Sequence, residues 1–407
     1  MEFLKLFQRH ADYEDFVSGD TMPRPNVSHC VSENEVHYNK FIHDYSKDYL
    51  TIEALENGTI GFSFNSYGPG SFEYSVDGGE TWGTLNSQNS EISVSSGDKI
   101  LFKKEPSRAQ APDPYLGNFY STCNFNAYGN PMSLIYGSNF SGQTEISINT
   151  LMYLFSGCDK LMSAENISLP ATRLGNKSYR YMFKGCTSIK VAPELPATIV
   201  SAYTYYGMFS GCTSLKEAPE LPATTLGESS YGNMFVGCTS IKVAPELPAT
   251  SITPSCYVHM FEGCTNLITA PSILPATTLN NHSHECYQGM FKGCIRLETA
   301  PILPADNFGD SSYVVSDNFY NEMFYGCSSL NYVKCYLTTT YKNCIANWLS
   351  GVAENGVYVR RVRSSDNSEI LSTIPSSWKI IYYDESEDKY YLDRRKETEC
   401  DDHGNLI

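Results

Sequence analysis

The sequence predicts a mainly β protein with short helical turns, built around a solenoid that covers residues 151–345. A Gly-Cys dipeptide recurs seven times in this stretch, at successive spacings of 28, 26, 26, 26, 30 and 33 residues. A period of this size is typical of solenoids, in which each copy forms one coil and stacks on its neighbours. The flanking segments alternate apolar and polar residues over short runs, as strands do. The seven cysteines are Cys158, Cys186, Cys212, Cys238, Cys264, Cys294 and Cys327.

The repeat unit is clearest over 203–226, where Tyr205 precedes Met208 by three residues. This spacing puts both side chains on one face of a short helix. Phe209 follows, and Gly211 is expected to end the helical turn. The next residues, Thr-Ser-Leu, are expected to form a short strand that stops at Ala-Pro, because proline removes a ladder donor. Stacking then hides Met, Phe and Leu, which is worth roughly 1.5–3 kcal/mol per side chain.

The repeated cysteines are interpreted as a structural column of buried free thiols. Side chains at one repeat position point the same way, so neighbouring thiols do not face each other as a disulfide requires. Metal sites need close cysteine pairs with histidine, and the nearest approach is His282 and His284 with Cys286 in a variable loop. We therefore predict no cofactor and no metal, and we name the two histidines only as candidate binding residues.

The pattern Met-Phe-x-Gly-Cys-Thr-Ser-Leu-x-x-Ala-Pro-x-Leu-Pro-Ala-Thr resembles the BspA-like leucine-rich repeats of Bacteroidales surface proteins and of phages that infect those bacteria. The resemblance covers about half of the chain. It implies a leucine-rich-repeat solenoid, and it implies a role in adhesion and attachment. Such repeats display surfaces and do not run reactions, so the resemblance is specific for fold and weak for function.

Residues 1–47 form a short segment that is too small to hold its own core. The runs at Pro25–Cys30 and Glu35–Asn39 resemble an entry segment of structural proteins from crAss-like phages. The resemblance implies an attachment or docking segment that joins other virion proteins. The alternative is an N-terminal strand that simply pairs with the next domain.

Residues 48–110 contain five short alternating runs and are expected to form a small β-sandwich. Ser75 to Trp82 resembles an Asp-box, a hairpin motif known from sialidases and many β-proteins, in which Asp77 and Gly79 suit the turn. No paired carboxylates for glycoside hydrolysis are evident. Residues 111–150 are expected to cap the solenoid at its N-terminal end. Residues 346–407 are expected to form a β-rich C-terminal cap with a charged tail.

Charge and hydropathy bear on the partners. The net charge is −16, and none of the segments above is basic, which disfavours nucleic-acid binding. No apolar run is long enough for a transmembrane helix, so membrane insertion is not expected. No secretory signal is evident near the start; a virion protein needs none, whereas a bacterial surface protein would carry one, and the sequence leaves open whether a leader was removed. No heptad seam is visible, and the sequence leaves open whether the chain forms a homo-oligomer.

Thirty tyrosines offer flat apolar faces with hydroxyls, a common recognition surface for sugars and proteins. The tyrosine three residues before each Met is interpreted as packing between coils. Tyr203, Tyr206 and Tyr313 do not follow the period and are the better candidates for contact with a ligand. They lie in loops of unequal length, where function concentrates on a regular scaffold.

Three functions follow as hypotheses. The first is a non-enzymatic phage virion protein, a fibre or capsid decoration, whose solenoid binds a host-surface glycan or protein. The second is a bacterial cell-surface adhesin of the BspA-like class. The third, suggested by the Asp-box, is an accessory module of a glycan-active enzyme. No catalytic arrangement is legible, so the sequence predicts that the chain is not an enzyme.

Overall fold

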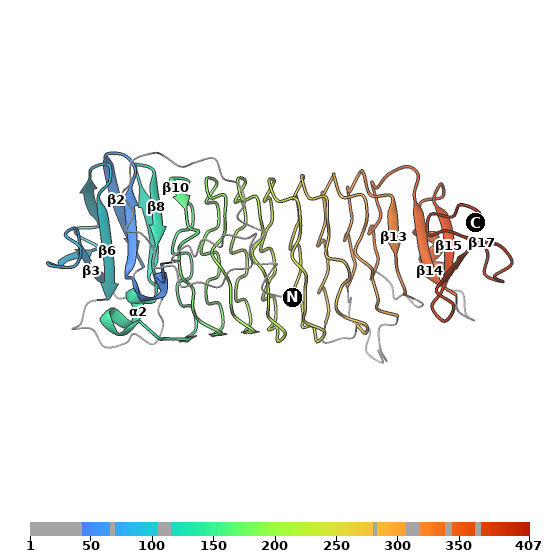
Figure 1. The fold of residues 1–407 in the computed structure, drawn as a ribbon, viewed down its shortest axis with the longest axis horizontal. Helices are drawn as coiled ribbons and strands as arrows, with labels where there is room; N and C mark the ends of the chain where they lie inside the picture. The colour runs from blue at the N-terminus through green and yellow to red at the C-terminus, as the bar shows by residue number, and fades with distance from the viewer. Residues whose placement is uncertain are drawn as a thin grey trace, which may run out of the picture. The chain divides into compact units, whose positions relative to one another are not determined.

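The computed structural model describes residues 43–65, 70–104, 115–279, 283–306, 318–337, 344–362 and 368–407. The chain divides into two units, Met1–His43 and Asp44–Ile407. Apart from His43, the first unit lies outside the described residues, and with it the docking segment predicted over 1–47 up to residue 42. The second unit is mainly β with few helices and contains a β-solenoid of about eight turns (Figure 1).

Two sheets open this unit, after the 3-10 helix η1 (Tyr45–Lys47). The strands of the first sheet run in the order β10-β8-β1-β6-β3-β4, and all of its neighbours are antiparallel except β10 and β8. The second sheet has the order β5-β2-β7 and is antiparallel. The bounds are β1 Leu50–Ala54, β2 Gly58–Phe64, β3 Ser71–Ser75, β4 Gly83–Asn86, β5 Glu91–Val94, β6 Lys99–Lys104, β7 Gly117–Ser121, β8 Phe125–Tyr128 and β10 Leu161–Ser163.

The two sheets share an aromatic core with the first turn of the solenoid. Phe62 of β2 packs edge-on against Phe72 of β3 and Phe119 of β7, with ring centroids 4.9 and 4.8 Å apart. Phe119 in turn stacks on Phe155 of the first turn at 5.3 Å. Strands from both predicted segments, 48–110 and 111–150, therefore belong to the same sheets, and β7 and β8 lead directly into the solenoid. The helices α2 (Ser133–Tyr136) and η2 (Gly137–Asn139) lie against β6.

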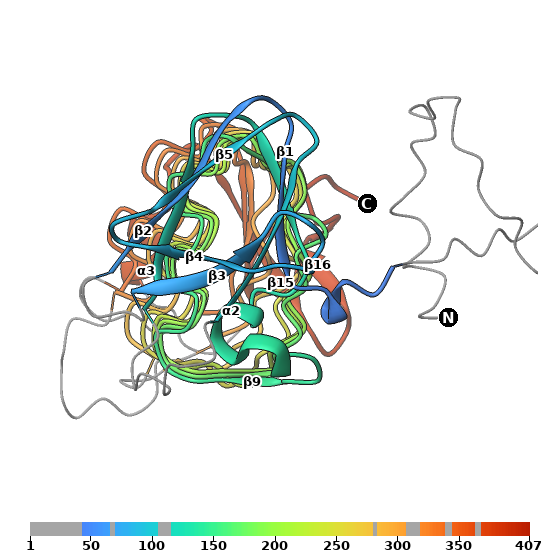
Figure 2. The ribbon, with the colours of Figure 1, turned by 90° about the vertical axis from the view of Figure 1, so that its left-hand side faces the viewer.

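Successive turns of the solenoid lie side by side, and seen end on they superpose around one interior (Figure 2). Parallel pairing between turns is short. β9 (Glu145–Ile146), β11 (Arg173–Leu174) and β12 (Ile199–Val200) form one small sheet. Single bridges such as Val191 to Glu217 continue the contact elsewhere.

The strand predicted at Thr-Ser-Leu is wrong in position. Thr213 and Ser214 lie in a turn, and the bridge falls at Glu217, two residues after the buried Leu215. The bridge is one residue long because Ala-Pro follows it, and proline has no backbone N–H to extend the ladder.

The helix predicted before each Gly-Cys is also wrong. We call the stretch from eight residues before this glycine to the residue after it the Gly-Cys segment, as in 203–212. The residues eight and four before the glycine and the glycine itself have a positive φ: Tyr203 at 58°, Gly207 at 60° and Gly211 at 78°, and in this segment Tyr205 has one as well, at 58°. A left-handed residue at this interval stops a helix from forming. The same pattern recurs in the turns that end at Gly185, Gly237, Gly263, Gly293 and Gly326.

Hydrogen bonds explain this backbone. Alternate N–H groups point to the next turn, so that Gly207 donates to the Gly232 carbonyl at 2.9 Å and Phe209 to that of Met234 at 3.0 Å. The N–H groups between them close local four-residue turns, as the Met208 N–H does by donating to the Tyr205 carbonyl. About half of the backbone N–H groups in the segment therefore bond within the segment, and the others bond to a neighbouring turn. Each turn thus depends on its neighbour for its backbone conformation.

Three side-chain columns fill the interior. Phenylalanines stack with centroids 5.3–5.8 Å apart, and tyrosines with centroids 5.7–5.9 Å apart. Each repeated cysteine donates its thiol hydrogen to the Phe carbonyl of the preceding turn, over S–O distances of 2.9–3.2 Å. The Phe column is Phe119, Phe155, Phe183, Phe209, Phe235, Phe261, Phe291 and Phe324, and the Tyr column is Tyr179, Tyr205, Tyr231, Tyr257, Tyr287 and Tyr320.

Burial keeps the acidic groups of these columns neutral. It raises the pKa of the Cys212 and Cys264 thiols to about 12 and that of the Tyr205 hydroxyl well above its usual value. The hydroxyls of the six column tyrosines are buried and have no hydrogen-bond partner in the part of the chain that the structure describes. Ionising any of them would place a charge in the apolar interior.

The solenoid continues one turn beyond the seven repeats of the sequence. Trp348 takes the place of the repeated Met, because its carbonyl accepts the Phe324 N–H at 2.9 Å as that of Met323 accepts the Phe291 N–H. Gly351 has a φ of 76°, like every glycine of the Gly-Cys pairs. The sequence breaks its pattern here because Leu349 replaces Phe and Val352 replaces Cys, but the larger Trp348 side chain still fills the interior.

A five-stranded sheet closes the far end, in the order β13-β14-β15-β16-β17. Its first three strands are parallel and the last two pairings are antiparallel. Trp348 contacts Tyr358 of β14 edge-on, which joins the last turn to this sheet. The bounds are β13 Tyr332–Lys334, β14 Val357–Arg361, α3 Ser368–Ser372, β15 Lys379–Asp384, β16 Lys389–Tyr391 and β17 Glu399–Cys400.

The buried thiols yield a first prediction. All thirteen described cysteines are buried, and none of them forms a disulfide. Only the thiolate reacts, and burial raises the pKa of the seven Gly-Cys thiols. Because all thirteen are also shielded from solvent, we expect none of them to react with Ellman's reagent in the native protein within minutes at pH 8. All fourteen cysteines of the chain should react in denaturant. Fast labelling of two or more native thiols would contradict the closed column.

Candidate binding surface

The Gly-Cys segments present one outer face to solvent, and at the second and third turns this face is aromatic and basic. Within each segment, the side chains five, four and one before the glycine project outward wherever the residue is not itself a buried glycine, while Tyr, Met and Phe project inward. In the turn that ends at Gly185 the outward residues are Arg180, Tyr181 and Lys184. The next turn adds Tyr203 and Tyr206. We call these five residues the Arg180 cluster.

Arg180 lies among three tyrosine rings. Its guanidinium carbon is 5.1 Å from the centroid of Tyr181, 5.1 Å from that of Tyr206 and 5.6 Å from that of Tyr203. The Lys184 ammonium lies 4.9 Å from the Tyr181 ring. Tyr181 and Tyr206 meet edge-on at 5.5 Å. These cation–π contacts hold the guanidinium in one place before any ligand arrives.

Glycines in the next turn make room for the rings. A Cβ at Gly207 would lie 2.3 Å from the Tyr181 ring, and a Cβ at Gly232 would lie 2.9 Å from that of Tyr206. Each ring therefore lies against backbone where any larger residue would push it away. Gly207 also has a φ of 60°. Glycine is therefore favoured at this position for two reasons, the close approach of the Tyr181 ring and the left-handed backbone.

The tyrosine surface extends beyond the cluster toward the N-terminal sheets. Tyr115, Tyr153 and Tyr181 follow one another with centroids 5.6 and 5.1 Å apart. All three are only partly buried. They form a row that runs from turn to turn, so the surface is elongated along the stack rather than confined to one pocket.

The charge of Arg180 is not balanced by a carboxylate. None lies within 4.0 Å of its guanidinium among the described residues, and its Nε is buried without a hydrogen-bond partner there. Glu228 lies at the edge of the cluster, where it accepts the Tyr203 hydroxyl at 2.7 Å. That hydrogen bond raises the pKa of Tyr203, because it favours the neutral phenol.

The surrounding sequence is locally basic. Residues 166–193 contain five basic residues and no acidic one, in a chain of net charge −16. Arg173 pairs with Glu145 at 3.6 Å, whereas Lys177, Lys184 and Lys190 are exposed and have no carboxylate within 4.0 Å among the described residues. This turn therefore carries an uncompensated positive charge.

The predicted binding residues meet different outcomes. Tyr203 and Tyr206 lie together in the cluster, with centroids 5.9 Å apart. His282 and Tyr313 lie outside the described residues. His284 is exposed three turns further along the stack, so it does not join the cluster. Cys286, considered beside it as a metal ligand, is fully buried, and burial raises the pKa of its thiol well above the usual value.

Arg180, Tyr181 and Lys184 were missed by sequence reasoning. The available signal was the run of basic residues in 166–193, which is invisible when charge is counted over the whole solenoid. The spacing of Arg180 and Lys184 by four residues gives no hint by itself, because the neighbouring Tyr203 and Tyr206 come from the following turn.

The side chains of Ser75 to Trp82, the stretch that resembles an Asp-box, form their contacts within or next to their own hairpin. Asp77 accepts the Thr81 N–H at 2.9 Å and the Ser75 hydroxyl at 2.7 Å. Trp82 donates its indole N–H to the Gly79 carbonyl at 3.1 Å, and Lys103 lies 3.7 Å from the indole ring. The hydrogen bonds from Thr81 are the main cause that holds the pKa of Asp77 well below its usual value. These contacts account for the motif as a turn.

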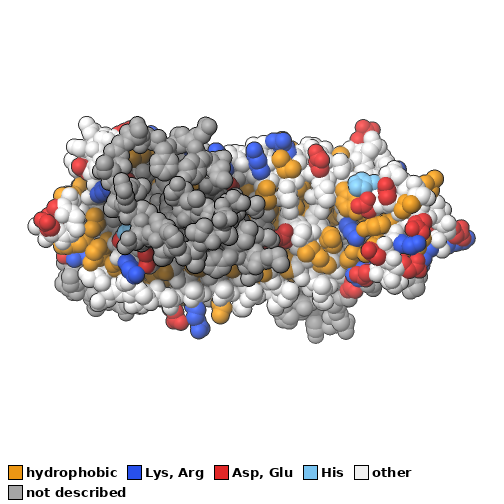
Figure 3. Space-filling view, viewed as in Figure 1, with side chains coloured by type: hydrophobic (Ala, Val, Ile, Leu, Met, Phe, Trp, Pro, Cys, Tyr) orange, Lys and Arg blue, Asp and Glu red, His pale blue; other side chains and the backbone are white. Residues whose placement is uncertain are grey.

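A second group of cations and tyrosines lies on the C-terminal sheet, where acidic and basic side chains mix (Figure 3). Lys334 is 3.7 Å from the Tyr383 ring and hydrogen-bonds the Tyr390 hydroxyl at 3.0 Å. Arg361 lies over Tyr336 and pairs with Glu385 at 2.6 Å. An open hollow of about 410 Å³ lies beside them. Unlike Arg180, Arg361 already has a carboxylate, so this group is less available to an anionic ligand.

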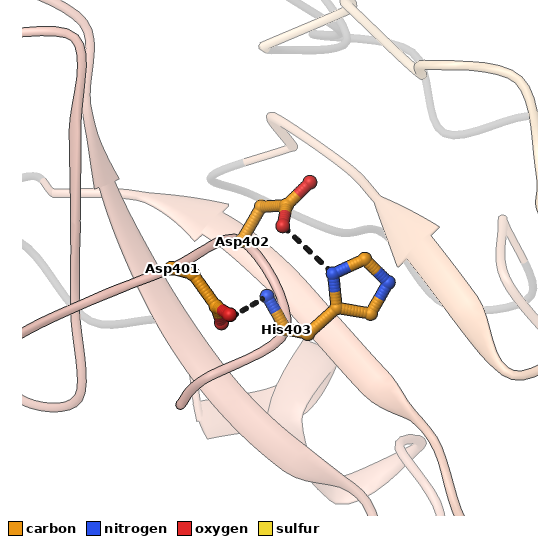
Figure 4. Close-up of side chains that lie close together, drawn as sticks. All are labelled: Asp401, Asp402 and His403. Atoms are coloured by element: carbon orange, nitrogen blue, oxygen red, sulfur yellow. Dashed lines mark hydrogen bonds and ion pairs between the residues drawn. The ribbon is translucent and has the colours of Figure 1, made fainter. Parts of the chain in front are cut away.

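Asp401, Asp402 and His403 lie close together near the C-terminus (Figure 4). Asp402 contacts His403 Nδ1 at 2.7 Å, and Asp401 accepts the His403 N–H at 2.9 Å. Asp401 also accepts the backbone and side-chain N–H groups of Asn405, both at 2.8 Å. The arrangement is that of a loop closed by a capping aspartate.

A smaller hollow of about 240 Å³ lies beside the first sheet, where Lys99 and Glu53 face each other at 3.8 Å. In the described part of the chain, no helix is long and apolar enough to cross a membrane. Comparisons of the chain with family models, with curated proteins and with solved structures found no match.

Proposed function

We propose that this chain is a non-enzymatic binding protein, and that its solenoid is a scaffold which holds the Arg180 cluster for contact with a cell-surface glycan or protein. The observation that carries this proposal is the cluster itself. A guanidinium without a carboxylate partner lies among tyrosine rings on an outward face. Tyrosine and arginine are the side chains that most often dominate recognition surfaces.

The rigidity of the scaffold supports the same role. Stacked aromatic columns and hydrogen bonds between turns fix the backbone beneath the cluster, so little conformational entropy is lost when a ligand binds. The polar groups most suited to chemistry, the column thiols and hydroxyls, are buried and kept neutral.

The biological setting follows from the sequence resemblance. We propose a leucine-rich-repeat protein of the BspA-like class that serves in a phage virion as a fibre or capsid decoration, with a small N-terminal β-sandwich between the solenoid and the particle. In this setting the N-terminal segment docks on other virion proteins. A bacterial cell-surface adhesin of the same class is the second candidate, and it uses the same surface.

Adsorption to cells tests the proposal. The purified chain should adsorb to cells of a susceptible Bacteroidales host, and Tyr206→Ala should weaken adsorption by roughly tenfold, as loss of an interface tyrosine does. Lys242→Gln, at an exposed position outside the Gly-Cys segments, serves as the control and should bind like the wild type.

Equal adsorption of wild type and Tyr206→Ala would reject the cluster as the binding surface. Mass spectrometry of purified phage particles separates the two settings. Presence of the chain in the particles supports the virion protein, and its presence only in bacterial surface fractions supports the adhesin.

A further inference from the structure

We infer that the Arg180 cluster binds a uronate-bearing polysaccharide, with the Arg180 guanidinium on a sugar carboxylate. This inference rests on the proposed function and adds the ligand class. It starts from the charge of the turn. Residues 166–193 hold five basic residues and no acidic one, and Lys177, Lys184 and Lys190 are without a carboxylate within 4.0 Å among the described residues. The ligand that complements such a basic surface is an anion.

The guanidinium is prepared for a planar anion. Three rings hold it within 5.6 Å of their centroids, and its buried Nε has no hydrogen-bond partner among the described residues. A guanidinium offers paired N–H donors that match the two oxygens of a carboxylate. Because the rings already fix Arg180, little side-chain entropy remains to be lost on binding.

The tyrosines select a sugar over a bare anion. Tyr153 and Tyr181 stack at 5.1 Å, and Tyr203 and Tyr206 border Arg180 on the following turn. Aromatic rings of this kind offer apolar faces and edges together with hydroxyls, which suits a pyranose with its apolar C–H groups and polar hydroxyls. The Glu228 carboxylate, held by Tyr203, can accept a hydrogen bond from a sugar hydroxyl.

The length of the surface points to a polymer. Tyr115, Tyr153 and Tyr181 run from turn to turn beside the cluster, and Lys177 and Lys184 flank Arg180 on the same segment. A chain with a carboxylate on recurring sugars can place charges near more than one of these cations. Long-range attraction does not help, since the net charge is −16, so binding must come from these local contacts.

Isothermal titration of the full chain tests the inference with three probes: an oligogalacturonate, a dextran fragment without charge, and poly-L-glutamate without sugar. We expect the oligogalacturonate to bind at least roughly tenfold more tightly than either of the others, and binding to weaken as salt is added. Arg180→Gln should weaken it by roughly tenfold or more, because a charge-assisted hydrogen-bond pair is lost. Lys242→Gln should leave it unchanged.

Two further variants guard against a folding artefact. Arg180→Lys keeps the charge without the paired donors and should fall between wild type and Arg180→Gln. Lys184→Gln, at an exposed position, should weaken binding roughly 2- to 5-fold with no change in thermal midpoint.

Four results would overturn the inference: equal binding of polyglutamate, equal binding of dextran, an unchanged affinity in Arg180→Gln, or no binding of oligogalacturonate. The last result leaves the proposed function in place if wild-type chain still adsorbs to cells and Tyr206→Ala does not. Failure of both assays rejects the proposed function as well.

Discussion

The protein is expected to unfold cooperatively between about pH 9 and pH 11 under reducing conditions. Burial raises the pKa of Cys158, Cys212, Cys264 and Cys327 from the ordinary value of 9.0 to about 12. Above pH 9 the unfolded chain releases these protons and the folded chain keeps them. The unfolded state then binds fewer protons, so the free energy of unfolding falls as pH rises, and it is independent of these groups well below pH 9.

The loss of stability at high pH is comparable to the total stability of a typical protein, so unfolding is expected. At pH 10.5 each of the four thiols removes about 2 kcal/mol of stability, or about 8 kcal/mol together, against a typical total of about 5–15 kcal/mol. The buried tyrosine hydroxyls act in the same direction, since burial raises their pKa as well. Circular dichroism at a series of pH values, combined with urea titration, measures the change.

A single substitution gives a matched control for the alkaline transition. Cys212→Ala removes one titrating thiol and should reduce the slope of unfolding free energy against pH by about 1.4 kcal/mol per pH unit between pH 9.5 and 11. The comparison uses slopes, so the cavity left by the substitution does not affect it. A urea midpoint that stays constant up to pH 11 would contradict the buried ionisable column.

Replacing Phe209 with alanine is expected to lower the free energy of unfolding by about 3–5 kcal/mol. Phe209 is fully buried and stacks on Phe183 at 5.6 Å and on Phe235 at 5.8 Å. The substitution removes both ring contacts and leaves a cavity at the middle of the stack, where each turn relies on its neighbours. Urea denaturation of the full chain checks this.

The control for Phe209 is an apolar residue at the surface. Val243 is 57% exposed, and Val243→Ala should change the unfolding free energy by less than about 0.5 kcal/mol. A loss below about 1 kcal/mol in Phe209→Ala would mean that the Phe column does not hold the turns together.

The repeat itself could be predicted because it depends on spacings between residues that are close in the sequence. The interval between glycines marks the turns, and the Tyr, Met, Phe and Cys positions that recur in it are the ones that face the interior. The backbone of the Gly-Cys segment could not be predicted in the same way. Tyr181 and Tyr203 adopt φ values of 56° and 58°, which their residue type does not favour, because the N–H groups there are drawn to carbonyls of the next turn.

The eighth turn was hidden for a related reason. Trp348 and Leu349 do not match the Met and Phe of the repeat, yet both are buried in the interior, and the Trp348 carbonyl accepts the same hydrogen bond from the turn before as the repeated Met does. Packing accepts any apolar side chain of suitable volume, whereas a sequence pattern counts only identities. A repeat at the end of a stack also faces a different neighbour, here the sheet that contains Tyr358.

Some residues of the candidate surface could likewise be predicted from the sequence, and others could not. Tyr203 and Tyr206 could be named from the sequence because they depart from the period, while Arg180 could not, since 23 residues separate it from Tyr203. The sequence by itself determined the period, the inward columns and the solenoid class, because each of these depends on spacing within one turn. Only the tertiary structure decided that Arg180 lies among three tyrosines, because stacking places residues one turn apart side by side, with an offset that no spacing along the chain records.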